Sequence, residues 1–126
     1  MLFRSPEIFT EYELLGVHCV LFSTTGGELS DGTIFATETQ GHAAANTYWV
    51  SFSVHAQHSS ITPAGVITPR GVWAAQCPRD GRASFVVVDI DNSPGNGARL
   101  WRRTARSGIY DSHLVQDERS EDRLKF

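Results

Sequence analysis

The sequence predicts an α/β fold in which a mixed β-sheet carries helices on one face. Helical and strand-like patterns alternate in the first half of the chain, as they do in layered α/β folds with parallel strands. Further along, Pro69-Arg70-Gly71 lies between two apolar runs, which indicates a hairpin and hence antiparallel strands. Only two helical patterns precede this hairpin, too few to cover both faces of a sheet.

The first helix is predicted from Pro6. Ser5 is a good N-cap, and proline suits the first helical position because its missing N–H would have no partner there. Gly16 is a natural residue to end the helix, and the branched apolar run 17–22 then predicts a buried strand. The helical stripe consists of Ile8, Phe9, Tyr12 and Leu15.

A loop is expected over residues 23–32, followed by a second helix over residues 33–46 with Gly41 as a weak point inside it. Large apolar residues then alternate with small or polar ones over residues 48–54, which predicts a strand. Residues 55–63 are expected to form a polar loop.

The hairpin strands are predicted over residues 65–68 and 72–76, and a further strand over Ala83–Ile90, where Phe85-Val86-Val87-Val88 is continuously apolar. A turn cluster follows, and then a short basic helix over residues 99–106. From Asp111 onward charge dominates, so an extended arm is expected.

Bulk composition narrows the class of protein. A chain of 126 residues suggests one domain. The net charge of -3 argues against a nucleic-acid partner and predicts no general attraction to anionic membranes. No apolar run approaches a membrane span, and no signal peptide is expected from the first residues. With two cysteines whose spacing requires no disulfide, a cytoplasmic protein is expected.

The opening segment resembles the nitrilase (carbon-nitrogen hydrolase) superfamily. In that family a nucleophilic cysteine opens a run of the type Cys-x-Asp-x-Arg-Phe-Pro-Glu. Arg4, Pro6 and Glu7 fit this run, while Ser5 replaces the phenylalanine. The resemblance places the cysteine immediately before Met1.

Later segments resemble the family in the same order. Ala43 and Asn46 match a family motif of the type Arg-Ala-x-Glu-Asn, although His42 and Ala45 do not. The remaining similar segments are the strand that starts at Tyr48-Trp49-Val50, the hairpin Val66–Gly71, the strand Phe85–Asp89, and a C-terminal extension at Leu100–Arg103.

The resemblance implies a fold and a division of the chain. The family fold is an α-β-β-α sandwich, and the matching segments cover only the C-terminal half of it. Residues 1–92 would be this half-domain, and residues 93–126 a C-terminal helix and charged tail.

The family chemistry uses a cysteine nucleophile, a glutamate base and a lysine that stabilises the oxyanion. By the resemblance all three precede this segment, and Lys125, in the charged tail, is the only lysine of the chain. Cys19 is expected to pack in a strand, and Cys77 is expected to lie at the surface or half-buried. For both cysteines these roles are favoured over that of a nucleophile. The chain therefore has no predicted catalytic residue and is expected to be inactive alone.

Pocket residues are predicted after the first strand. Thr24-Thr25-Gly26-Gly27 could cradle an anion through backbone N–H groups, but it lacks the lysine of a phosphate loop. The resemblance places this loop at the edge of the substrate pocket. Thr24, Thr25 and Glu28 are the substrate-binding candidates, with a purely structural role as the alternative.

Other constellations favour plain surface roles. His55 and His58 lie in a polar loop with nothing to arrange them as metal ligands, so no metal and no cofactor is expected. A basic cluster precedes the acidic tail, and pairing with this tail or with a partner subunit is expected. The cluster consists of Arg99, Arg102, Arg103 and Arg106.

Two functional hypotheses follow. In the first, the chain is part of an amidase or nitrilase that acts on a small-molecule amide or nitrile, forms homo-oligomers, and uses a cysteine acyl-enzyme when complete. In the second, it is a non-catalytic remnant that associates with itself or with a partner, because a half-domain exposes the face that its other half would cover.

Overall fold

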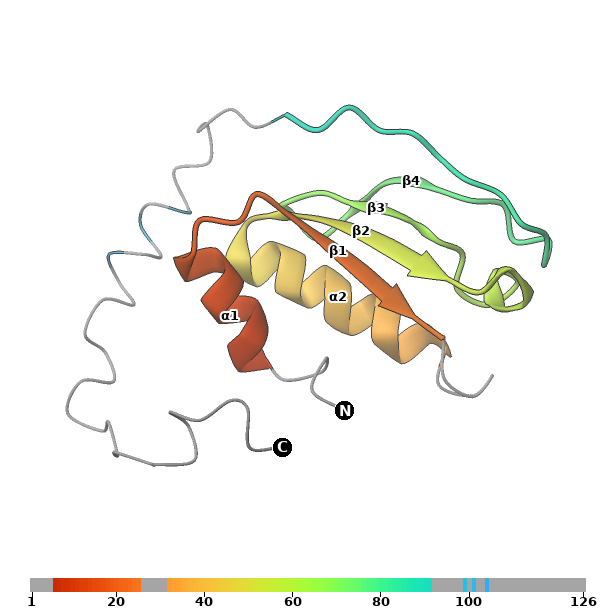
Figure 1. Cartoon of the computed structure of the whole chain (residues 1–126), viewed down its shortest axis with the longest axis horizontal. Helices are drawn as coiled ribbons and strands as arrows, with labels where there is room; N and C mark the ends of the chain where they lie inside the picture. Colours follow the sequence, from red (N-terminus) through yellow and green to blue (C-terminus); the bar gives the residue numbers. More distant parts are fainter. Residues whose placement is uncertain (1–5, 26–31, 92–98, 100, 102–103, 105–126) are drawn as a thin grey trace.

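The computed structural model describes residues 6–25 and 32–91, together with Arg99, Trp101 and Thr104. Its element order is α1 (Pro6–Leu14), β1 (Cys19–Thr24), α2 (Gly32–Asn46), β2 (Trp49–Val54), the 3-10 helix η2 (Ala56–His58), β3 (Gly65–Ile67) and β4 (Trp73–Gln76). Figure 1 shows both α-helices on one face of the sheet. The predicted α/β class with a mixed sheet and helices on one face is therefore confirmed.

The four strands lie in the order β1-β2-β3-β4. β1 and β2 are parallel, with Cys19 beside Trp49 and Thr24 beside Val54, and α2 forms the crossover between them. β2 pairs with β3 and β3 with β4 in antiparallel fashion. The carboxyl ends of both parallel strands therefore lie at the same end of the sheet.

α1 ends where the sequence predicted. Gly16 has a positive φ of 78°, which glycine adopts without steric cost. The N–H of Val17 donates to the carbonyl of Tyr12 at 3.0 Å, and the N–H of Gly16 to that of Glu13 at 3.0 Å. This pair of bonds is the Schellman arrangement, which satisfies the last carbonyls of the helix. The turn directs the chain into β1.

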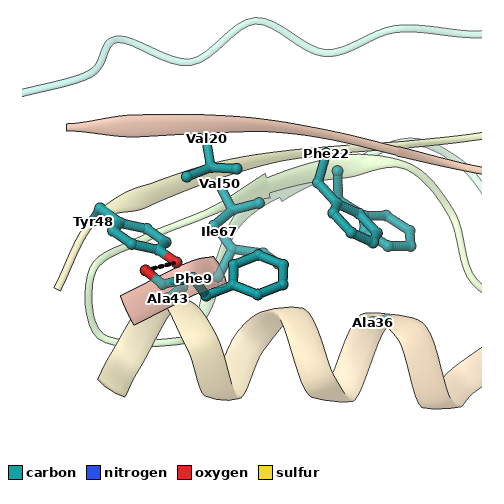
Figure 2. Packing of buried hydrophobic residues seen from close by; sticks show 9 residues of the cluster. Phe9, Val20, Phe22, Ala36, Ala43, Tyr48, Val50 and Ile67 are labelled. Atoms are coloured by element: carbon teal, nitrogen blue, oxygen red, sulfur yellow. Dashed lines mark hydrogen bonds between the residues drawn. The ribbon is translucent and has the colours of Figure 1, made fainter. Parts of the chain in front are cut away.

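The hydrophobic core lies between the sheet and the two helices (Figure 2). Alternate strand residues point to this side, so Val20 and Phe22 of β1 are buried while Leu21 between them is 82% exposed. Phe22 stacks on Phe52 of β2, with ring centroids 5.9 Å apart. The core consists of Phe9, Val20, Phe22, Ala36, Ala43, Tyr48, Val50, Phe52 and Ile67.

The hairpin joins β3 to β4 and contacts α2. Gly71 has a φ of 77°, and its N–H donates to the carbonyl of Thr68 at 2.9 Å. The side-chain amide of Gln40 donates to the carbonyl of Gly71 at 2.9 Å. The predicted hairpin is thus confirmed, and one hydrogen bond fixes it against the second helix.

The prediction of a strand over Ala83–Ile90 is wrong. Residues 83–91 form no strand, and they run over the face of the sheet opposite the helices (Figures 1 and 2). Phe85 is 85% and Val87 81% exposed, whereas Val86 and Val88 are half-buried. The apolar run correctly predicted an extended segment, but a strand also needs a neighbouring edge, and no described strand supplies one here.

Three smaller predictions are corrected. β1 spans Cys19–Thr24 rather than residues 17–22, and the polar loop contains η2. Cys77 is buried, with 6% of its surface exposed, instead of lying at the surface or half-buried. Within the predicted basic helix, Arg99, Trp101 and Thr104 are helical, and the other residues of this segment lie outside the described residues. The predicted N-cap Ser5 and the charged tail also lie outside them.

Candidate functional site

The parallel strands define one edge of the sheet as the first place to look for a site. Thr24, the last residue of β1, lies directly beside Val54, the last residue of β2. In open α/β sheets, ligands bind outside the carboxyl ends of the parallel strands. We call this region the carboxyl edge, comprising Thr24, Thr25, Val54 and His55.

A cavity of about 160 Å³ opens beside the end of β2. Its lining combines an apolar wall with hydroxyl, thiol and guanidinium groups. The lining residues are Val54, Ala56, Ser59, Ala64, Cys77, Arg82, Ala83 and Ser84. We call it the edge cavity.

Short-range hydrogen bonds position Ser59 in the edge cavity. η2 turns the chain immediately after β2, and the N–H of Ser59 donates to the carbonyl of Ala56 at 2.9 Å. The Ser59 side chain is buried, with 4% exposed, and its Oγ accepts a hydrogen bond from the N–H of Gly81 at 2.9 Å. The same hydroxyl therefore connects the loop after β2 to the turn before residue 82.

A tight turn brings Arg82 to the cavity. The N–H of Arg82 donates to Oδ1 of Asp80 at 2.9 Å, and Gly81 between them has a φ of 72°. One step earlier, the N–H of Cys77 donates to the carbonyl of Ala64 at 2.8 Å and continues the pairing of β3 with β4. The Asp-Gly turn signal in the sequence predicts the turn but not which surface Arg82 meets.

The predicted pocket residues and the observed cavity are neighbours but do not coincide. Thr24 lies at the carboxyl edge, one strand away from the cavity wall at Val54, and Thr25 follows it with its side chain exposed. Glu28 lies outside the described residues. Sequence reasoning did not identify Ser59, Arg82 or Ser84, because they come from separate loops that only the fold brings together.

Cys19 does not have the features of a nucleophile, and Cys77 is a buried residue of the edge cavity lining. Both are free thiols. Burial raises the pKa of Cys19, and a hydrogen bond with the Ser51 backbone opposes this shift without reversing it. A raised pKa lowers the thiolate fraction, and the thiolate is the reactive form.

The described residues contain no group of three side chains able to hold a metal ion. His55 is exposed, and His58 approaches the side-chain amide of Gln57 at 3.5 Å. These two histidines, which the sequence placed in a polar loop, flank and end η2.

A second hollow, of about 400 Å³, lies between α1 and α2. Its main aromatic member is His42, whose ring stacks on Phe9. Burial lowers the pKa of His42, and the Glu38 carboxylate opposes this effect. The hollow is lined by Pro6, Thr10, Glu38, Gly41, His42, Ala45 and Asn46.

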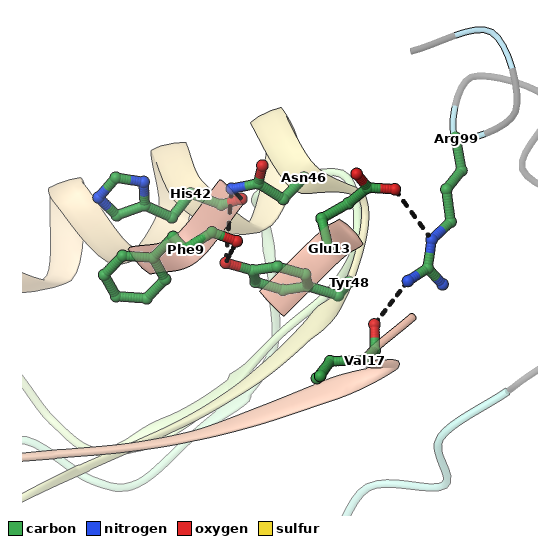
Figure 3. A network of polar contacts seen from close by, with 7 residues as sticks. All are labelled: Phe9, Glu13, Val17, His42, Asn46, Tyr48 and Arg99. Atoms are coloured by element: carbon green, nitrogen blue, oxygen red, sulfur yellow. Dashed lines mark hydrogen bonds and ion pairs between the residues drawn. The ribbon is translucent and has the colours of Figure 1, made fainter. Parts of the chain in front are cut away.

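A polar network closes the end of the core near this hollow (Figure 3). The Tyr48 hydroxyl donates to the carbonyl of Phe9 at 3.2 Å and accepts from the Asn46 amide at 3.4 Å. Desolvation raises the pKa of Tyr48 strongly, so this hydroxyl stays protonated and serves as a structural donor.

Arg99 contacts the junction of α1 and β1. Its guanidinium lies 3.6 Å from the carboxylate of Glu13, which is 1% exposed, and donates to the carbonyl of Val17 at 2.6 Å (Figure 3). The sequence suggested pairing of the basic cluster with the acidic tail or with a partner subunit, and the tail lies outside the described residues. Within the described part of the chain, the acidic residue that Arg99 contacts is Glu13, a buried residue of the first helix.

In the described part of the chain, no helix has the length and apolar character needed to cross a membrane. Comparison of the sequence with models of known protein families finds no matching family, and comparisons with curated proteins and with solved structures find no match either.

Proposed function

We propose that this chain is the C-terminal half of a carbon-nitrogen hydrolase domain of the amidase or nitrilase type. When complete, the enzyme would hydrolyse a non-peptide C–N bond of a small amide or nitrile through a cysteine acyl-enzyme. The observation that carries this proposal is a sheet with helices on one face and exposed apolar side chains on the other. That arrangement supports the proposal, because half of an α-β-β-α sandwich would have the same two layers.

The open face is apolar in a way that favours a second layer. Leu21 projects from β1 on the side away from the core and is 82% exposed. Over the same face, residues 83–91 alternate between half-buried Val86 and Val88 and exposed Phe85 and Val87. A segment that is apolar on both sides is typical of a strand buried between two layers. We infer that it would join a second sheet supplied by the other half.

The proposed reaction has a natural place at the carboxyl edge. α1 and β1 run in roughly opposite directions (Figure 1), so the first turn of α1 points toward the edge where Thr24 ends β1. In the family, the nucleophile directly precedes this helix. Thr24, Thr25 and Glu28 remain the proposed substrate-binding residues, and the attacking cysteine would come from outside this chain.

In the complete enzyme, the two halves of the domain would contribute different parts of the active site. The external cysteine would attack the amide or nitrile carbon, and water would then release the acid from the acyl-enzyme. This chain would contribute a pocket wall, half of the core and a surface for homo-oligomer formation. We propose a cytoplasmic location, which agrees with the free thiols of Cys19 and Cys77.

Ammonia release from simple amides and nitriles tests the proposal. The purified chain is expected to show no turnover above background, and neither is a variant with Cys19→Ala and Cys77→Ala. Turnover that survives replacement of both cysteines would contradict the proposal, because the nucleophile would then be a different residue of this chain.

The coding sequence upstream of the Met1 codon provides an independent test. We expect an in-frame cysteine codon immediately before it, with lysine and glutamate codons further upstream. An upstream frame that lacks these residues contradicts the proposal.

The exposed apolar face also favours a second candidate function, a non-catalytic module that associates with itself or with a partner. Leu21→Lys should reduce association measured by light scattering, whereas Leu14→Lys on α1, a residue 62% exposed, is the matched control. A compact monomer with strong hydrogen-exchange protection supports an independent binding module. Weak protection, or oligomers that persist in Leu21→Lys, support a half-domain.

A further inference from the structure

We propose that the edge cavity binds a small carboxylate, with Arg82 as its counter-ion. This inference concerns binding alone and does not depend on the hydrolase proposal. It starts from the polar groups of the cavity, which are rich in hydrogen-bond donors. Arg82, Ser84 and Ser59 all line it.

None of these donors has an acceptor among the described residues. The guanidinium of Arg82 forms no ion pair within the described part of the chain, where only its backbone N–H is bonded, to Asp80. The Ser84 hydroxyl has no hydrogen bond to any described residue. The Ser59 Oγ accepts from Gly81, and within residues 6–25 and 32–91 its own proton has no acceptor. Since Ser59 is 4% exposed, this proton cannot rely on bulk water.

Arg82 and Ser84 are exposed, so water solvates their donors, and a ligand that accepts hydrogen bonds can replace this water. A carboxylate has two acceptor oxygens, can pair with both arms of a guanidinium, and forms charge-assisted hydrogen bonds that are shorter and stronger than neutral ones. Asp80 is the nearest acidic residue in sequence, but it is not part of the cavity lining. The cavity therefore supplies positive charge and donors without a competing carboxylate.

The remaining wall and the volume define the rest of the ligand. Val54, Ala56 and Ala64 form an apolar surface that suits a short hydrocarbon chain. A cavity of about 150 Å³ holds benzene, with about six non-hydrogen atoms. The edge cavity has a volume of about 160 Å³, so a four-carbon monocarboxylate such as butyrate matches both size and polarity.

NMR titration of the isotope-labelled 126-residue chain tests the proposal. Sodium butyrate at constant ionic strength should shift the backbone amide signals of Gly81, Arg82 and Ser84 saturably, with a dissociation constant on the order of millimolar. Butyramide, which has the same shape without the charge, should bind at least about tenfold more weakly than butyrate. Sulfate, which matches the charge but not the apolar wall, should also bind more weakly than butyrate.

Matched variants locate the binding. Arg82→Gln should weaken butyrate binding about tenfold or more, whereas Arg79→Gln, an exposed arginine outside the cavity lining, should leave it unchanged. Signals from the core residues Val50 and Phe52 report whether each variant remains folded. The proposal is overturned if butyrate gives no saturable shift, if butyramide or sulfate binds as tightly, or if both arginine variants lose binding equally.

Discussion

The ring of His42 lies flat on the ring of Phe9, with centroids 4.0 Å apart and an interplanar angle of 5°. This contact joins the C-terminal part of α2 to the middle of α1. It keeps the imidazole partly out of water, and burial accordingly lowers the pKa of His42 below its ordinary value of 6.5, with Glu38 opposing.

His42 should make stability depend on pH. Between its lowered folded pKa and 6.5, the unfolded chain binds more protons than the folded chain. This contribution to stability is therefore fully present above pH 6.5 and is lost as the pH falls toward the folded pKa. His42→Phe keeps an aromatic ring on Phe9 and should flatten this part of the profile in urea unfolding from pH 5 to 8. The exposed His55→Gln is the control, and an unchanged profile in His42→Phe contradicts the account.

Tyr48→Phe should lower the free energy of unfolding by about 1–2 kcal/mol, because it leaves the buried carbonyl of Phe9 and the Asn46 amide without the hydroxyl. Tyr48→Leu also removes the buried ring and should cost more. Urea denaturation of both variants separates the hydrogen bonds from ring packing. An unchanged free energy of unfolding in Tyr48→Phe would show that the hydroxyl contributes nothing, and equal losses in the two variants would show that ring packing contributes nothing.

Gly71→Ala should destabilise the protein more than Gly81→Ala. Both glycines have positive φ, so both variants pay for backbone strain of about 1–2 kcal/mol. At Gly71 an added Cβ would also lie 2.8 Å from the carbonyl oxygen of Gln40, whereas at Gly81 it meets nothing within 4 Å. The difference in unfolding free energy measures the close approach of the hairpin to α2, and a difference of zero would argue against it.

Gly41→Ala should stabilise the chain by about 0.5–1 kcal/mol, because glycine inside a helix costs backbone entropy. Gly41 lies within α2 and is exposed, and an added Cβ would contact nothing within 4 Å. Thermal unfolding should show a higher midpoint with unchanged helical circular dichroism. A lower midpoint would contradict the prediction.

Arg99→Met should destabilise the protein by about 3 kcal/mol, as expected when one partner of a buried ion pair is removed. It leaves the carboxylate of Glu13, which is 1% exposed, without its arginine and removes the donor to Val17. Arg79→Met, at an exposed position, should change the free energy of unfolding by less than about 0.5 kcal/mol. Similar small effects of both substitutions in urea unfolding would contradict the role of Arg99.

Much of the helix and strand content could be predicted because its signals are local. Pro6 and Gly16 bracket the first helix, and Pro69-Arg70-Gly71 produces the hairpin through the conformations of its own residues. The alternation of large and small residues likewise identified β2. Backbone preferences and side-chain periodicity act over a few residues, so these elements were readable without the fold.

The candidate site was less predictable. Thr24 was expected in the loop after the first strand, whereas it is the last residue of β1, because strand bounds depend on pairing with a neighbouring strand. The edge cavity is different: Ser59, Arg82 and Ser84 belong to two loops, and their meeting depends on where the chain turns after β4. No local sequence pattern specifies that these two loops come close together.

The sequence by itself therefore determined the α/β class and the two helices that cover one face, and it located the segments that form the four strands while predicting a fifth that does not form. Only the tertiary structure decided that residues 83–91 cross the open face without pairing, that Arg99 reaches Glu13, and that three hydrogen-bond donors line one cavity. The physical reason is the same in each case. Propensity and periodicity specify which residues form helices and strands and which side chains are buried. Strand pairing, ion pairs and ligand binding depend on which groups the packed chain brings close together.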